Sequence, residues 1–245
     1  MAVAGEFQTA ESIGPAGEAR GAPALGLWLA LWMLLSAAMW ATGARSASLA
    51  TAVEGGAARI ERDGVAAPSD EAVRKAVALQ RAALPFWTTV QLLGDFVFEP
   101  AAMTLRALAT AVGFTACAAL AGRGLRFDRA WADAARLQGW WVAGLAMRLG
   151  LVAWLGRPEE GVDTSAALLL GPGAHPAPAW LALRAIDAFA IAGWLAIAAA
   201  GRRRGDANAA VALGLCGSLA AVEASARVAI GWFAGSAMRL ALTAS

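Results

Sequence analysis

Long apolar runs separated by shorter polar segments make up most of the chain. The first run covers residues 25–42, and four later runs cover residues 101–121, 137–155, 179–200 and 209–233. A helix rises 1.5 Å per residue, so each run is near the ~20 residues that cross a ~30 Å hydrocarbon core. A helix also satisfies its own backbone hydrogen bonds, as lipid requires of a spanning segment. The pattern therefore predicts an all-α, polytopic membrane helix bundle with about five transmembrane helices.

The start of the chain has two interpretations. Residues 1–23 are expected to form a flexible tail, and residues 24–42 the first transmembrane helix. The alternative is a cleaved signal peptide, but such peptides begin with a basic segment and have an apolar region of about 7–15 residues. Here the flank carries three glutamates against Arg20, and the apolar run is long enough to span. Both features favour a span that is retained.

Residues 43–100 are more polar and are expected to form an extramembrane loop with amphipathic or interfacial helices. The clearest helix covers residues 69–84, with two acidic residues in its first turn, where negative charge suits the helix dipole. Its apolar stripe lets it pack on the protein or lie in the plane of the lipid headgroups, and the pattern leaves both open. Residues 86–98 are too few to cross and contain Asp95, so an interfacial or re-entrant piece is expected.

The second half of the chain contains the other four spans, within residues 101–234, and a C-terminal tail at 235–245. With five spans, the two arginine-rich loops at 122–136 and 201–208 lie on the same side as the N-terminus. Cytoplasmic loops carry the excess of Lys and Arg, which predicts a cytoplasmic N-terminus and an external C-terminus. Arginine outnumbers lysine nineteen to one and alanine is abundant, which suggests a GC-rich bacterial genome and hence the bacterial cytoplasmic membrane.

Composition agrees with this fold class and excludes several functions. The chain is 59% hydrophobic and 16% charged, with a mean hydropathy of +0.57, whereas soluble domains are about 45–50% apolar and about 25% charged. The net charge of +2 does not point to nucleic acid. Cys117 and Cys216 lie in apolar runs and are expected to be packing residues, and His175 is the only histidine. Accordingly, no metal, cofactor or catalytic residue is expected.

Ionisable residues inside the predicted spans are the informative positions, because each costs roughly 2.5–3.5 kcal/mol at a helix centre. They are Arg148, Arg184, Asp187, Glu223 and Arg227, together with Arg106, which is near a span end and is expected to snorkel. Spacing pairs Glu223 with Arg227 and Arg184 with Asp187 within single helices, and Arg148 could join either pair. These charges are either neutralised pairs that fix helix register, which we favour, or a polar transport path.

Arginines and small residues suggest where lipids or other helices make contact. Arg202, Arg203 and Arg204 are candidates for contacts with anionic lipid headgroups, although membrane topology alone explains them about as well. Small residues recur every four positions in the second and fifth spans, a weak signal for close helix packing and oligomer contacts. The expected partners are the lipid bilayer and other membrane proteins or copies of the chain.

Two stretches resemble a known family. Residues 122–130 read Gly-Arg-Gly-Leu-Arg-Phe-Asp-Arg-Ala, and residues 183–189 read Leu-Arg-Ala-Ile-Asp-Ala-Phe, followed by Trp194. They resemble the glycine-rich loop and the Leu-Asp-Leu-Phe-x-x-Trp stretch of the Yip domain family, five-span membrane proteins known in eukaryotes as partners of Rab/Ypt GTPases. Trp194 lies two places later than that spacing. The resemblance implies a membrane scaffold or trafficking-type component, and the Rab link does not carry to a bacterial chain.

These observations lead to one leading hypothesis and two alternatives. The leading one is a non-enzymatic membrane scaffold or assembly component that acts through lateral protein or lipid contacts. The second is a transporter or permease subunit with a polar path near Arg148, Asp187 and Glu223. The third is an intramembrane enzyme, which is least favoured because no nucleophile–base pair or ligand cluster is evident.

Overall fold

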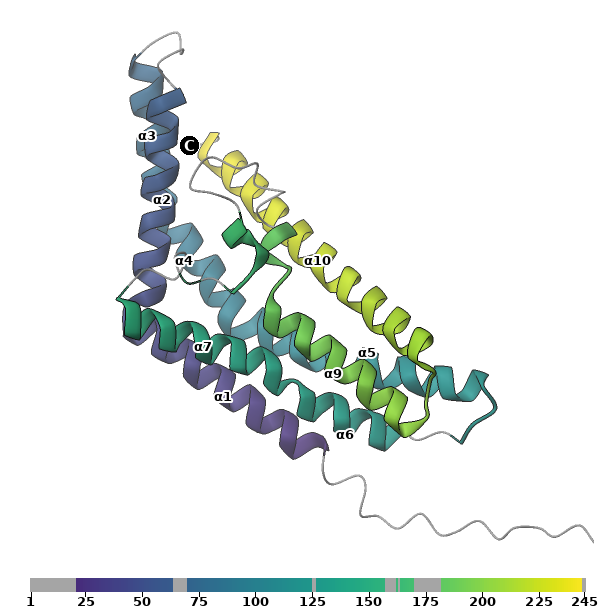
Figure 1. Cartoon of the computed structure of the whole chain (residues 1–245). Helices are drawn as coiled ribbons and strands as arrows, with labels where there is room; N and C mark the ends of the chain where they lie inside the picture. Colours follow the sequence, from purple (N-terminus) through teal and green to yellow (C-terminus); the bar gives the residue numbers. More distant parts are fainter. Residues whose placement is uncertain are drawn as a thin grey trace, which may run out of the picture.

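The chain is all-helical (Figure 1). The computed structural model describes residues 21–63, 70–124, 127–156, 162, 164–169 and 182–243. Within these ranges the one strand-like contact is an isolated bridge between Ser165 and Asp187. The elements are α1 (Gly21–Ala41), α2 (Ala44–Asp63), α3 (Asp70–Ala82), α4 (Leu84–Leu93), the π-helical turn η3 (Gly94–Phe98), α5 (Glu99–Leu120), α6 (Phe127–Leu137), α7 (Gly139–Leu155), the 3-10 turn η5 (Ala166–Leu169), α9 (Ala188–Arg204) and α10 (Ala209–Thr243). The predicted all-α fold is confirmed.

Three helices among the described residues are long and apolar enough to cross a membrane. They are Gly21–Ala41, the continuous stretch Asp70–Leu120, and Ala209–Ser236 within α10. Helices α7 and α9 have 17 residues each, which is about 25 Å of helix. This is just short of the ~30 Å thickness of the hydrocarbon core. The structure therefore supports a membrane protein, and the count of five spans stays a prediction.

The predicted break between residues 98 and 101 is wrong, because the helix continues from α4 through η3 into α5. The π-helical turn explains how a proline fits there. The Glu99 N–H donates to the Gly94 oxygen, five residues back, and Pro100, which has no N–H to donate, follows directly. Residues 86–98 are thus continuous with α5 and do not end as a separate segment before Pro100.

Three further boundaries differ from the prediction. Helix α1 begins at Gly21, so residues 21–23 are helical, whereas residues 1–20 lie outside the described residues. Helix α9 begins at Ala188 instead of residue 179, because the Asp187 side chain accepts hydrogen bonds from Phe189 N–H and Ala190 N–H and caps the helix. Helix α10 continues to Thr243, through most of the predicted C-terminal tail.

Helices α2 and α3 form a hairpin that extends away from the other helices (Figure 1). The predicted amphipathic helix at 69–84 is present as α3, and it packs on α2, as one of the two alternatives left open by the sequence expects. Ala57 of α2 and Val77 of α3 are buried in the hairpin region. Arg81 on α3 binds Glu54 on α2 through two nitrogens, at 3.0 and 2.9 Å, in an exposed ion pair.

The core of the bundle has two parts. One surrounds Phe114 of α5, which is fully buried against Ile197 of α9 and Cys216 of α10. The other surrounds Met39 of α1 and Met103 of α5 and includes residues of α7. In the core around Phe114, α9 approaches α5 so closely that only glycine fits at residue 201. A Cβ on Gly201 would lie 2.2 Å from the Phe114 ring. Cys216 is 2% exposed, as expected of a packing residue.

The basic loops and the start of α1 gather at one end of the bundle (Figure 1). A Cβ on Gly21 would touch Trp131 of α6, and Arg123 after α5 donates to the Gly205 carbonyl after α9. Arg204 at the end of α9 binds Asp133 of α6. This arrangement agrees with the prediction that both basic loops lie on the same side as the N-terminus. Which side of the membrane that end faces stays a prediction.

Candidate functional site: ion-pair clusters inside the bundle

Glu223 of α10 is the centre of a polar cluster that joins two helices. It accepts hydrogen bonds from Arg106 of α5, with Nε at 2.8 Å from Oε2, and from Arg227, with Nη2 at 2.8 Å from Oε1. Arg227 also binds Glu99, at the start of α5, with Nη2 at 2.8 Å from Oε2. The predicted Glu223–Arg227 pair within α10 is therefore present, and it belongs to a network that ties α10 to α5.

Arg106 does not snorkel, contrary to the expectation from its position. Its side chain is 1% exposed, and its Nη1 donates to the Gln138 Oε1 at 2.7 Å. Its guanidinium also lies 3.9 Å from the ring centroid of Trp141, a cation–π geometry. Gln138 separates α6 from α7 and is itself fully buried. Because Trp141 lies on α7 and Glu223 on α10, Arg106 connects its own helix α5 to both.

A second cluster holds Asp187 at the N-terminus of α9. Its Oδ2 accepts from Arg148 Nη2 of α7 at 2.8 Å and from the Thr164 hydroxyl. Of the two pairs that the sequence left open to Arg148, the structure shows contact with Asp187.

The predicted placement of Arg184 and Asp187 within one transmembrane helix is wrong. Arg184 lies before the helix, in a short helical turn at 182–184, and Asp187 is the N-cap of α9. A carboxylate at an N-cap satisfies backbone N–H groups that have no partner within the helix. The acid therefore caps the start of α9 instead of lying within the helix.

The third cluster surrounds Asp95, which sequence reasoning placed in an interfacial segment. Asp95 is 2% exposed and lies in the π-helical turn η3. Its carboxylate accepts from Arg45 Nε and Nη2, Trp40 Nε1 and Gln91 Nε2, all at 3.0 Å. Its backbone carbonyl accepts from Trp32 Nε1 at 2.9 Å. The signal in the sequence was an acid within an apolar run, but its arginine and its two tryptophan partners are 50 or more residues away.

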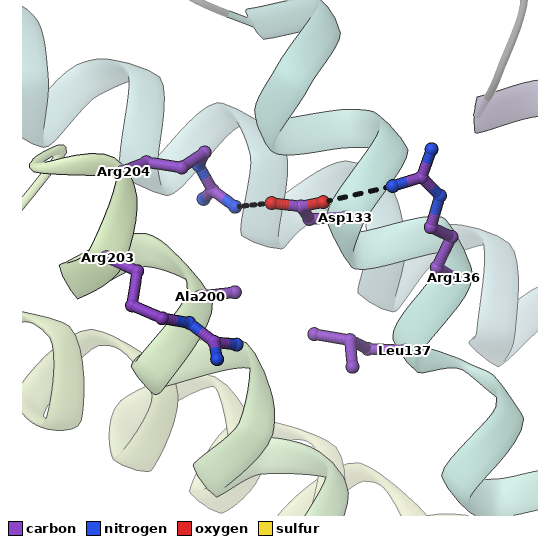
Figure 2. A pocket seen from close by; sticks show the side chains of 6 residues that line it. All are labelled: Asp133, Arg136, Leu137, Ala200, Arg203 and Arg204. Atoms are coloured by element: carbon purple, nitrogen blue, oxygen red, sulfur yellow. Dashed lines mark hydrogen bonds and ion pairs between the residues drawn. The ribbon is translucent and has the colours of Figure 1, made fainter.

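A fourth cluster lines a pocket between α6 and α9 (Figure 2). The pocket holds about 350 Å³ and is lined by Asp133, Arg136, Leu137, Ala200, Arg203 and Arg204. Arg204 is not the free headgroup contact that the sequence suggested: its side chain is 13% exposed and binds Asp133 Oδ2 at 2.5 Å and Asp206 Oδ2 at 2.6 Å. Arg202 and Arg203 are exposed.

The chemistry of these clusters is that of paired charges. Asp95, Glu223, Asp187 and Asp133 each bind an arginine of another helix. Among the described residues, no three His, Cys, Asp or Glu side chains are placed to hold a metal ion. His175 lies outside the described residues. The arrangement can fix helices relative to one another, and it can present arginines at the end of the bundle where the basic loops gather.

Comparisons with known proteins identify no relative. No protein-family model matches the chain, and no curated protein or solved structure matches it. The Yip resemblance therefore stays a prediction from the residues quoted above.

Proposed function

We propose that this chain is a non-enzymatic, multi-pass protein of the bacterial cytoplasmic membrane that acts as a scaffold or assembly component of the Yip type. It acts through lateral contacts with lipids or other membrane proteins. The observation that carries the proposal is the pairing of interior charges: Asp95, Glu223 and Asp187 each bind an arginine of another helix. Paired charges of this kind set the register of packed helices.

The surface of α10 supports a role in lateral contacts. Only 11% of its most apolar window is buried, so most of this helix faces outward. Exposed side chains include Val222, Trp232 and Phe233, at 66%, 59% and 70% exposure. In a soluble protein such a stripe would be a liability, but it suits hydrocarbon or the apolar face of another membrane helix.

A transporter is the alternative that one observation favours. Glu223 and Arg148 are 21% and 22% exposed, so both can be reached from outside the bundle. A proton path needs a carboxylate that releases its partner and titrates during the cycle. Two arginines on Glu223 oppose that release, and we therefore rank transport second.

Charge neutralisation separates the two functions. We expect Glu223→Gln and Asp187→Asn to lower the melting temperature of the protein in detergent and to leave proton flux in proteoliposomes at the level of empty vesicles, as for the unaltered chain. The matched control is Glu54→Gln, which removes a carboxylate that is 58% exposed on α2. A proton flux that the unaltered chain supports and that Glu223→Gln abolishes without unfolding would establish the transporter instead.

Topology is tested separately with reporter fusions. We expect alkaline phosphatase to be active when fused after Ser245 and inactive when fused before Met1, since five spans place the C-terminus outside and the N-terminus inside. Fluorescent protein fusions, which fold only in the cytoplasm, should give the opposite pattern. Activity of alkaline phosphatase at both ends would rule out an odd number of spans.

A further inference from the structure

The pocket between α6 and α9 contains more positive charge than the aspartates beside it neutralise. Arg136 approaches Asp133 Oδ1 only at 3.7 Å, beyond hydrogen-bond distance, and its side chain is 52% exposed. Arg203 is exposed and has no hydrogen-bond or ion-pair partner among the described residues. Each guanidinium has five N–H donors in a planar fork. Two forks at one pocket therefore remain open to a ligand.

Arg204 is the anchored member of the group. Its Nε binds Asp206 and its Nη1 binds Asp133, and its guanidinium lies 5.6 Å from the centroid of the buried Phe114 ring. Asp206 is 7% exposed, so this pair is held inside the protein. Three arginines face two aspartates here, and one positive charge is left over at the pocket.

The shape and position of the pocket favour the phosphate group of a lipid over other anions. Arg203 and Arg136 lie on opposite sides of it, and Leu137 and Ala200 give it an apolar wall (Figure 2). The pocket lies at the end of the bundle where the arginine-rich loops gather (Figure 1). In a membrane protein, clustered arginines at a helix end are expected at the depth of the lipid phosphates. Guanidinium forks match the oxygens of a phosphate, and a phosphodiester carries one negative charge.

We propose that this pocket binds the phosphate group of an anionic phospholipid, with Arg203 and Arg136 donating to the phosphate oxygens and the apolar wall contacting the glycerol. Arg204 holds the walls together and contributes charge without moving. The inference rests on the proposed membrane role, because only a chain in the bilayer meets lipid headgroups. It assigns the lipid contact to a bounded pocket instead of to the whole run of arginines at 202–204.

The test uses the full chain purified in a non-ionic detergent and titrated with short-chain phosphatidylglycerol. Binding is read from the rise in melting temperature and from the dissociation constant. We expect Arg203→Gln and Arg136→Gln each to weaken binding about tenfold, which corresponds to about 1.4 kcal/mol, because each removes charge-assisted hydrogen bonds. The matched control is Arg202→Gln, which removes the same charge from an exposed residue next to Arg203 that does not line the pocket.

Two further titrations identify the source of the phosphate. We expect phosphatidylcholine, whose choline offsets the phosphate charge, and inorganic phosphate to bind more weakly than phosphatidylglycerol. If inorganic phosphate binds as tightly as the lipid, the assignment to a lipid is overturned. If Arg202→Gln weakens binding as much as Arg203→Gln, the contact is diffuse surface charge and the pocket is not a site.

Controls keep this test separate from the proposed function. Arg203 is exposed and has no hydrogen-bond or ion-pair partner among the described residues. Arg203→Gln is therefore expected to keep the melting temperature of the ligand-free protein, and it remains informative if Arg136→Gln does not fold. Equal lipid binding by all variants, in a chain that still sediments with membranes, overturns only the pocket. A chain that stays in the supernatant of a detergent-free lysate overturns the membrane role as well.

Discussion

Arg45 and Asp95 form a two-pronged ion pair in the interior, with both N–O distances at 3.0 Å and side-chain exposures of 6% and 3%. Arg45 is the second residue of α2, and Asp95 lies in the π-helical turn between α4 and α5. The pair therefore fixes the point at which the α2–α3 hairpin leaves the bundle. Trp40 of α1 donates to the same carboxylate, so α1 is tied to this point as well.

Neutralising Asp95 should destabilise the protein strongly. In the Asp95→Asn variant the buried Arg45 guanidinium loses this carboxylate, and removing one partner of a buried pair costs about 3–5 kcal/mol. We expect a large drop in the melting temperature of the detergent-purified protein. The matched control is Glu54→Gln, since Glu54 binds Arg81 with similar geometry but at 58% and 55% exposure. Equal drops in the two variants would show that burial does not decide the strength of the pair.

The indole N–H of Trp40 should contribute to the stability of the protein in addition to the packing of its ring. Trp40→Phe removes the donor that lies 3.0 Å from Asp95 Oδ2, and a hydrogen bond to a charged group is worth about 1.5–3 kcal/mol. We expect a measurable loss of stability in thermal unfolding. Trp154 is 82% exposed, so Trp154→Phe is the control and should change little.

The contact of Gly201 with Phe114 should tolerate no side chain. An alanine Cβ there would lie 2.2 Å from a ring that is fully buried, and overpacking of this kind costs about 1–3 kcal/mol. We expect Gly201→Ala to lower the melting temperature. Gly26→Ala in α1 should be neutral or stabilising, because nothing lies within 4 Å of its Cβ position and alanine favours the helix.

Asp187 should show two separable contributions, as a helix cap and as the partner of Arg148. Asparagine is as good an N-cap as aspartate, so Asp187→Asn removes the charge but keeps an acceptor for Phe189 and Ala190. Alanine removes both. We therefore expect Asp187→Ala to cost about 1 kcal/mol more than Asp187→Asn. If unfolding in detergent gives equal losses, the cap contributes nothing and the effect is the ion pair alone.

The local sequence pattern was enough to predict helices whose capping residues and apolar stripe lie within the helix itself. The helix over residues 69–84 was predicted from its acidic first turn and its apolar stripe, and α3 matches it within two residues. The apolar run at 101–121 likewise corresponds to α5. Its junction with residues 86–98 was missed because Pro100 normally signals a break, and only the widened hydrogen bonding of η3 removes that break.

Ion pairs within one helix could likewise be predicted from the sequence, whereas ion pairs between helices could not. Glu223 and Arg227 are four apart on one helix, so spacing alone predicted their contact. Arg106 was misplaced because distance from a span end says nothing of which helix packs over it, and here Glu223 and Gln138 enclose it. The Asp95 cluster was not foreseen, because its arginine and its two tryptophans lie on other elements.

Hydrophobicity and helix length are properties of contiguous residues, so the sequence predicts that helices form and that several are too apolar for water. Three outcomes are visible only in the folded protein: which charges meet, where α9 begins, and that Arg136 and Arg203 line one pocket. Those outcomes depend on packing between segments far apart in the chain, and no local pattern encodes the distance between two helices.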